Sequence, residues 1–215
     1  MSTPITPFSE PSATTSPTFS FGGYAVEEVG LPGIAFWPRA GARLIDCVLH
    51  YCVTYSAGFL FSLLVLAASG GHMPPWVMAR FRHPGLFKFI PGLLGFVVYS
   101  VICVSMHGST LGKRLISAVV MQESGIRCRT VPAVIRELAY FVDSLFFGLV
   151  GYLAMQGSYQ EQRYGDRWAR TVVAKRANVI PEQLRSDGRF VVTLMLAVMM
   201  DAALGMIGLL ILISG

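Results

Sequence analysis

Long apolar runs alternate with short polar segments along this chain of 215 residues. Two runs, from about Leu44 to Ala68 and from about Phe190 to Ile213, exceed the roughly 20 residues that a helix needs to cross a bilayer. A third run, from about Leu86 to Met106, has a similar length. The pattern predicts a small bundle of membrane helices.

A fourth apolar stretch extends from Pro132 to Met155, with basic residues crowded on both sides. Five Lys and Arg lie between 107 and 136, and seven lie between 156 and 189. Cytoplasmic segments carry such an excess, so both flanks are expected on the cytoplasmic side. The stretch is therefore predicted to be a re-entrant or broken helical hairpin bent between Asp143 and Gly151. The alternative is an ordinary third crossing.

Three short runs have the residue types of strands, namely Leu115 to Val120, Ile126 to Val131 and Thr171 to Lys175. The first is also compatible with a continued helix. These runs predict a short β-hairpin or small sheet on the cytoplasmic side. The expected fold is thus an all-α membrane protein, a small helical bundle of three to four membrane segments with this β-structure attached.

Residues 1–36 form an arm rich in Pro, Ser and Thr, a composition that favours disorder unless a partner holds it. Residues 37–176 are expected to form the membrane domain. Residues 177–215 are an extension that carries the last span.

The composition supports lipid as the solvent, because only 13% of residues are charged and 53% are hydrophobic, against about 25% charged in soluble domains. The net charge of +5 then indicates cytoplasmic loops near anionic lipid, and not nucleic-acid binding. The four cysteines form no CxxC pair, so no metal or disulfide framework is expected. The first residues do not resemble a cleavable signal peptide, so the first span is expected to act as the insertion signal.

Polar side chains mark the first and last spans. Arg43, Asp46, His50 and Thr54 recur at helical spacing and share one face. Asp201 lies near the middle of the last span, where a carboxylate costs roughly 2.5–3.5 kcal/mol to insert. Asp201 must therefore be protonated, paired or turned toward a polar interior.

Two interpretations of these charges stay open. In one, His50, Asp143 and Asp201 form an ion or proton site. In the other, the charges form a structural latch. Asp46 then pairs with Arg43 or accepts a hydrogen bond from the Gly112-Lys113-Arg114 turn, while Asp166 ties its own loop to Arg43. That turn is not a phosphate-binding loop, because three residues separate its glycines and Arg follows the Lys. No nucleophile–base set or cofactor loop is present, so neither an enzyme nor a cofactor is expected.

Four motifs occur in a recognisable order. They are Arg43-Leu44-Ile45-Asp46, the segment from Gly108 to Val120 with its GSTLGKR start, the pair Arg136-Glu137, and the closing segment from Tyr164 to Val173. Together they resemble the RDD family over roughly Arg39 to Lys175. Two positions depart from the family pattern, because Gly165 replaces its usual His and Arg170 replaces its usual Gly.

The resemblance implies topology more than mechanism. Some family members have been proposed as sodium/proton antiporters, and others act as accessory scaffolds in membrane complexes. A chain this small shows no inverted repeat of the kind many transporters use. The expectation is an accessory or scaffold subunit without catalytic chemistry, and the alternative is a small oligomeric cation/proton transporter. The expected partners are the bilayer and other membrane subunits or further copies, and the expected location is a bacterial cytoplasmic (inner) membrane with the N-terminus cytoplasmic.

Overall fold

The computed structural model describes residues 31–72, 74–75, 89–158, 160–180, 184 and 187–214. Most of the predicted arm (1–36) lies outside the described residues. So do most of the loop from His72 to about Gly85 and the short helix expected to open at Pro181.

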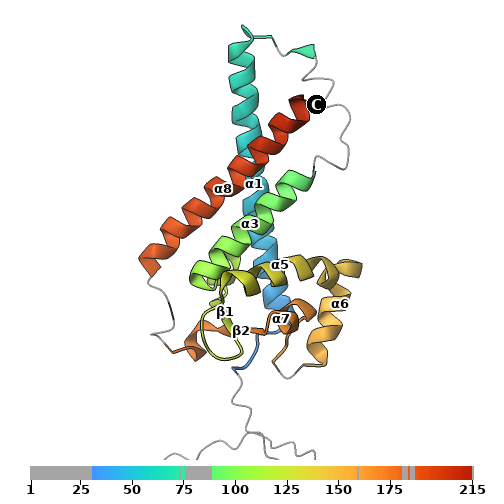
Figure 1. The fold of residues 1–215 in the computed structure, drawn as a ribbon, viewed down its shortest axis with the longest axis vertical. Helices are drawn as coiled ribbons and strands as arrows, with labels where there is room; N and C mark the ends of the chain where they lie inside the picture. Colours follow the sequence, from blue (N-terminus) through green and yellow to red (C-terminus); the bar gives the residue numbers. More distant parts are fainter. Residues whose placement is uncertain are drawn as a thin grey trace, which may run out of the picture.

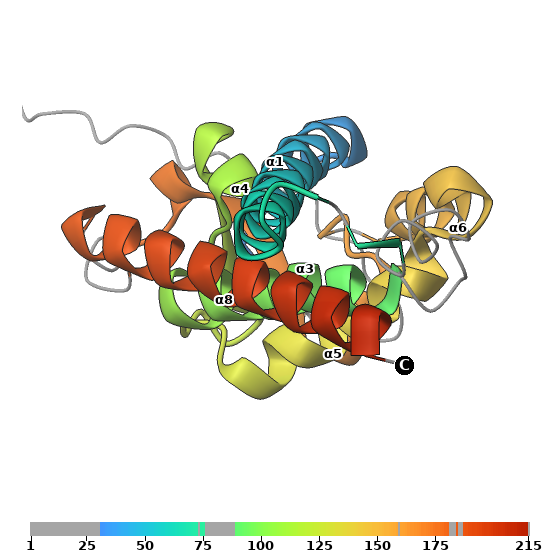
Figure 2. The same ribbon diagram turned by 90° about the horizontal axis from the view of Figure 1, so that it is seen from above.

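Three long helices form the upper part of the molecule (Figure 1). They are α1 (Phe36–Ala68), α3 (Phe89–His107) and α8 (Asp187–Ser214). Figure 2 shows α8 crossing α1 while it packs along α3. Among the described residues, α1 and the Gly188–Gly208 part of α8 are long and apolar enough to cross a membrane. A mostly helical protein with membrane helices is confirmed.

The contact between α3 and α8 is a small apolar core of Phe96, Tyr99, Cys103 and Ala197. The outer faces of the three long helices are also apolar. Tyr55 of α1, for example, is 73% exposed. An uncovered apolar surface of this kind is stable in lipid and not in water.

A two-stranded antiparallel sheet lies below the helices. Strand β1 (Ala118–Gln122) pairs with β2 (Thr171–Lys175), so that Val120 faces Val173. The N–H of Ile34 donates to the carbonyl of Val173 at 2.9 Å, which attaches the segment before α1 to β2. The prediction of a small sheet is confirmed.

The strand expected over Ile126 to Val131 is wrong. Arg127 makes an isolated bridge to Met121, and helix α5 (Thr130–Asp143) begins three residues later. Pro132 is the third residue of α5, and proline is well tolerated in the first turn of a helix.

Helix α5 is followed by α6 (Leu145–Gln156), and the two axes are bent by 113°. The bend falls at Ser144, inside the region predicted to break. Phe146, Phe147 and Gly148 have positive φ just after it. By length and composition the pair is a broken span or a re-entrant loop.

Two short helices complete the lower part, α4 (Leu111–Leu115) and α7 (Tyr164–Trp168), followed by the 3-10 turn η2 (Arg176–Asn178). Helix α4 lies directly against α1, because a Cβ at Gly112 would overlap the carbonyl oxygen of Ala42. We call α4, β1, α5, α7, β2 and the first three turns of α1 the cap. The candidate site lies inside it.

Candidate functional site

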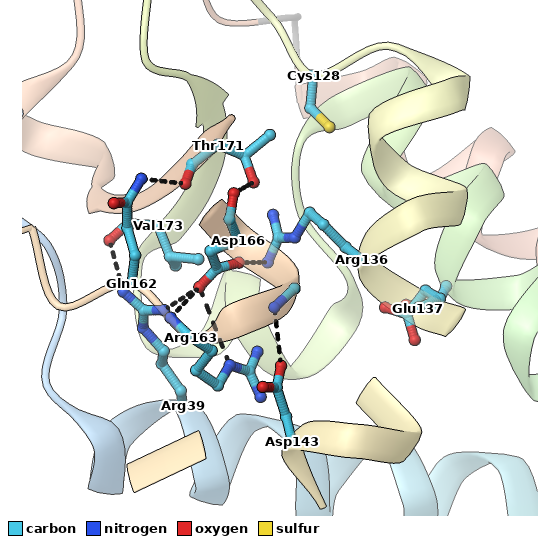
Figure 3. A network of polar contacts seen from close by, with 12 residues as sticks. Arg39, Cys128, Arg136, Glu137, Asp143, Gln162, Arg163, Asp166, Thr171 and Val173 are labelled. Atoms are coloured by element: carbon cyan, nitrogen blue, oxygen red, sulfur yellow. Dashed lines mark hydrogen bonds and ion pairs between the residues drawn. The ribbon is translucent and has the colours of Figure 1, made fainter. Parts of the chain in front are cut away.

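Asp166 is the centre of a buried charge cluster in the cap (Figure 3). Its Oδ2 lies 2.7 Å from Nη1 of Arg39, and its Oδ1 lies 2.9 Å from Nη2 of Arg136. Arg163 is more distant, with Nε at 3.9 Å. Burial alone would raise the pKa of Asp166, but the guanidinium of Arg136, with that of Arg39, holds it well below the usual range. Asp166 is therefore ionised at neutral pH and ties α1, α5 and α7 together.

The loop that presents Asp166 is fixed by its own hydrogen bonds. Asp166 accepts the backbone N–H of Arg163 at 3.3 Å, which satisfies a donor at the start of α7. The Gln162 side chain donates to the carbonyl of Thr171 at 3.0 Å and to Glu123 at 2.6 Å. These hydrogen bonds hold the segment between α6 and β2, and with it the carboxylate of Asp166, in a fixed position inside the cap.

Glu137 is a second buried carboxylate on α5. It lies 2.9 Å from Nη2 of Arg43 and accepts the Ser100 hydroxyl at 2.5 Å. The Arg43 guanidinium is also 4.2 Å from the ring centroids of both Phe96 and Tyr140. This arrangement joins α1, α3 and α5 at the level of the cap.

Asp46 makes no ion pair with Arg43 among the described contacts. It accepts hydrogen bonds from the Thr110 hydroxyl at 2.6 Å, the Gly112 N–H at 2.8 Å and the Tyr99 hydroxyl at 3.1 Å. Of the two contacts expected for Asp46, the structure has the one to the turn at Gly112. The expected contact of Asp166 with Arg43 is replaced by contacts with Arg39 and Arg136.

His50 and Asp201 form a separate pair higher in the helices. The His50 Nδ1 atom lies 2.8 Å and 3.1 Å from the two carboxylate oxygens of Asp201. Asp201 is only 2% exposed. Helix α3 approaches closely here, because a Cβ at Gly95 would overlap the Asp201 carboxylate. Of the three possibilities expected for Asp201, the structure shows it paired, with His50 as the partner.

Of the three residues proposed from the sequence as an ion or proton site, His50 and Asp201 are in contact, but Asp143 does not join them. Asp143 belongs to the cap, where its Oδ2 accepts the Gly165 N–H at 3.3 Å and its Oδ1 is buried without a partner. The polar stripe of α1 is likewise divided, since Asp46 contacts α4 while His50 contacts α8. The latch residues Lys113, Arg136 and Asp166 all lie in the cap. Burial, together with the nearby charge of Arg136, lowers the pKa of Lys113 to about 8.

Two cluster members, Arg39 and Arg163, were not predicted as site residues from the sequence, and Glu137 was noted only as part of the Arg136-Glu137 motif. Arg39 precedes Arg43 by one helical turn, a spacing that places both on one face. That signal was available, but it does not identify a partner 127 positions away. Hydroxyl donors such as Tyr99 and Thr110 carry no charge pattern and gave no signal.

A cavity of about 320 Å³ opens beside the cluster, between α1 and the α5–α6 bend. Its lining comprises Phe36, Arg39, Ala40, Arg43, Leu44, Cys47, Tyr140, Asp143, Ser144, Phe147, Gly148 and Arg163. Within the described ranges, no three His, Cys, Asp or Glu side chains are grouped to hold a metal ion. The arrangement fixes helices through buried charge and leaves one hollow with basic groups in its lining.

The chain was also compared with known proteins. The model of the RDD family matches residues 35–170, which include the whole charge cluster. No curated protein and no solved structure matches the chain.

Proposed function

Since the chain belongs to the RDD family of membrane proteins, we propose that it is an accessory or scaffold subunit of a larger membrane complex. It has no catalytic chemistry of its own in this proposal. It resides in the cytoplasmic (inner) membrane of a bacterium, with the cap and the N-terminus on the cytoplasmic side. The outer face of α6 carries the proposal.

Helix α6 presents an apolar stripe away from the rest of the molecule. Leu149 and Leu153 lie one helical turn apart in the regular part of α6, and each is more than half exposed. Leu145, before the residues with positive φ, is also more than half exposed. The opposite side of α6 packs inward, where the ring of Tyr152 lies 5.4 Å from that of Phe36. Figure 1 shows α6 beside the cap and not beside the long helices.

In this proposal the stripe lies outside the hydrocarbon layer, at the cytoplasmic end of α1. Helix α1 has 33 residues, so it is about 50 Å long, whereas the hydrocarbon core is about 30 Å thick. One end of α1 must extend beyond that core. Phe36 begins the end that carries Arg39 and Arg43, and α6 contacts Phe36. An exposed apolar stripe at that level supports a contact with another protein.

The start of α6 adds two exposed aromatic side chains, of which Phe147 lines the cavity between α1 and the α5–α6 bend. Phe146 is 77% exposed and Phe147 is fully exposed. Both have positive φ, at 50° and 59°, a conformation that costs of order 1–3 kcal/mol for each such residue. Exposed aromatics held at such cost are the usual anchors of protein interfaces.

Site-specific photo-crosslinking in native membranes tests this proposal. A photoreactive residue at Leu153 is expected to link the chain to a different membrane subunit, while the same residue at exposed Ser124 gives no such product. Adducts with lipid alone, or only with further copies of the chain, contradict an accessory role.

The pair of His50 and Asp201 favours a second candidate, a small oligomeric cation/proton transporter. A buried imidazole–carboxylate pair between membrane helices is a common element of proton pathways. Purified protein in liposomes is then expected to move protons in response to a sodium gradient. Asp201→Asn abolishes that flux, and Cys52→Ser, on the exposed face of α1, leaves it intact. No flux, or equal flux in both variants, removes this candidate.

A further inference from the structure

The cavity between α1 and the α5–α6 bend has walls of two kinds. Phe36, Leu44 and Phe147 form an apolar mouth, while Arg39 and Arg43 contribute guanidinium groups to the lining. Its volume of about 320 Å³ lies within the range of small-molecule sites. The hollow is thus suited to an amphiphile with a polar head and an apolar body.

Unpartnered polar atoms are concentrated in the residues that line this cavity. The Nε atoms of Arg39 and Arg43 and Oδ1 of Asp143 are buried without a hydrogen-bond partner. The buried Nε of Arg163 also lacks a hydrogen bond and has only the 3.9 Å ion-pair contact with Asp166. Buried polar atoms are nearly always paired, and exceptions require an explanation. Three N–H donors and one carboxylate acceptor match a ligand head that has phosphate oxygens and a hydroxyl donor.

The charge balance favours an anion in the same place. The adjoining hollow beneath the cavity is lined by five basic side chains and three acidic ones, the basic ones being Arg39, Arg43, Lys113, Arg136 and Arg163. Asp46 is the next carboxylate, and its oxygens are occupied by Thr110, Gly112 and Tyr99. Even with Asp46 included, positive groups outnumber negative ones, and buried charge of one sign is costly without a counter-ion.

The position in the membrane identifies the source of that anion. An apolar stripe on α1 leads away from the cavity mouth through Leu44, Val48, Tyr51 and Tyr55, which are all more than half exposed. These residues follow one helix face toward the membrane-crossing half of α1. The cavity therefore lies at the level of lipid head groups, with a path for acyl chains above it.

We propose that this cavity binds one anionic glycerophospholipid, with its phosphate at Arg43 and Arg163, its head-group hydroxyl at Asp143, and its acyl chains along the α1 stripe. The bound lipid supplies the negative charge that the cluster lacks and covers the fully exposed ring of Phe147. The proposal concerns the cavity, which Phe147 lines, whereas the test of the accessory role uses Leu153, which does not line the cavity, so each proposal can fail without the other.

Native mass spectrometry of the full chain in detergent tests the proposal, with phosphatidylglycerol and phosphatidylcholine as probes. Phosphatidylglycerol is expected to remain bound at one equivalent, and phosphatidylcholine is not. Arg163→Gln removes one charged hydrogen-bond donor and is expected to weaken phosphatidylglycerol binding about ten-fold. Arg129→Gln removes the same charge from an exposed position outside the cavity and leaves binding unchanged.

A second pair of variants tests lipid binding at an exposed position, where a substitution does not disturb folding. Phe147→Asp places a negative charge at the mouth on a fully exposed side chain and is expected to weaken phosphatidylglycerol binding, whereas Leu145→Asp, which does not line the cavity, is not. Inorganic phosphate at millimolar concentration is expected not to displace the lipid. Equal retention of both lipids, equal affinity of Arg163→Gln and Arg129→Gln, or displacement by phosphate would overturn the proposal.

Discussion

The guanidinium of Arg39 lies 2.7 Å from the carboxylate of Asp166, although 127 positions separate them in the chain. Both side chains are almost completely buried. Loss of one partner leaves the other charge uncompensated, which costs about 3–5 kcal/mol. Asp166→Asn is therefore expected to lower the free energy of unfolding in detergent micelles by about that amount. Ser124→Ala, at an exposed position outside the cluster, should change it by less than about 0.5 kcal/mol.

The same carboxylate predicts a dependence on acid. The pKa of Asp166 is lower in the folded chain than in the unfolded chain, mainly because Arg136 and Arg39 overcome the effect of burial. Its contribution to stability is complete above the unfolded pKa of about 3.9 and is lost as the pH falls below that value. Thermal unfolding between pH 7 and pH 3 checks this, since the variant Asp166→Asn should show a weaker loss than the wild type.

The lowered pKa of Lys113 leads us to expect a change of stability in the alkaline range. Its pKa is about 8 in the folded protein and about 10.4 in the unfolded chain. Between these values the unfolded chain binds the extra proton, so stability rises with pH. Lys113→Met should flatten this rise and increase stability at pH 7, while Lys175→Met, at an exposed position, preserves the rise. A parallel profile in Lys113→Met would exclude the lysine as its source.

The backbone conformation at Arg170 explains why glycine suits this position of the family pattern. Its φ is +50°, a left-handed conformation that glycine adopts without strain, and the family has glycine at this position. Arg170→Gly is expected to stabilise the folded chain by about 1 kcal/mol. Arg129 has an ordinary φ of −89°, so Arg129→Gly should give no gain. Equal effects in chemical unfolding would refute the assignment of strain.

Gly112 sets the distance between α4 and α1. A methyl group there overlaps the carbonyl oxygen of Ala42, and overpacking of this kind costs about 1–3 kcal/mol or more. Gly112→Ala should therefore lower the unfolding temperature and weaken the contact of Asp46 with the turn. Gly41→Ala is the matched control, because nothing lies within 4 Å of its Cβ position. That variant should be neutral or slightly stabilising.

The 113° bend after α5 predicts which side each loop occupies. If α6 returns toward the sheet, then cysteines at Ser124 and Gln156 are labelled by a membrane-impermeant thiol reagent from the same, cytoplasmic side. A cysteine at His72 is labelled from the opposite side. The native Cys47, Cys52, Cys103 and Cys128 are first replaced. Labelling of Ser124→Cys and Gln156→Cys from opposite sides would establish a crossing.

The periodic features of the chain were predictable from the sequence, because they depend on local pattern. The apolar runs at α1 and α8, the β-prone runs at β1 and β2, and the break after Asp143 all carry a local signal. The error over Ile126 to Val131 came from weighing β-branched residues above Pro132. Proline has a known preference for a first helical turn, and this preference would have favoured the helix.

The pairings inside the site were not predictable in the same way. Helical spacing places Arg43, Asp46 and His50 on one face of α1, but it does not say which element packs on each part of that face. The crossing of α8 determines that His50 meets Asp201, and the close approach of α4 at Gly112 determines the partners of Asp46. These are consequences of three-dimensional packing between distant segments, and one sequence carries no direct signal for them.

The buried partners of α1 are synthesised long after α1 itself. Gly112, which binds Asp46, follows by 66 residues, Glu137 follows Arg43 by 94, and Asp166 follows Arg39 by 127. At about 5–20 residues per second, Asp166 is synthesised about 6–25 seconds after Arg39. The three contacts of α1 can therefore form only in the order Gly112, Glu137, Asp166 as the chain is made. A chain that stops before Asp166 lacks the buried partner of Arg39.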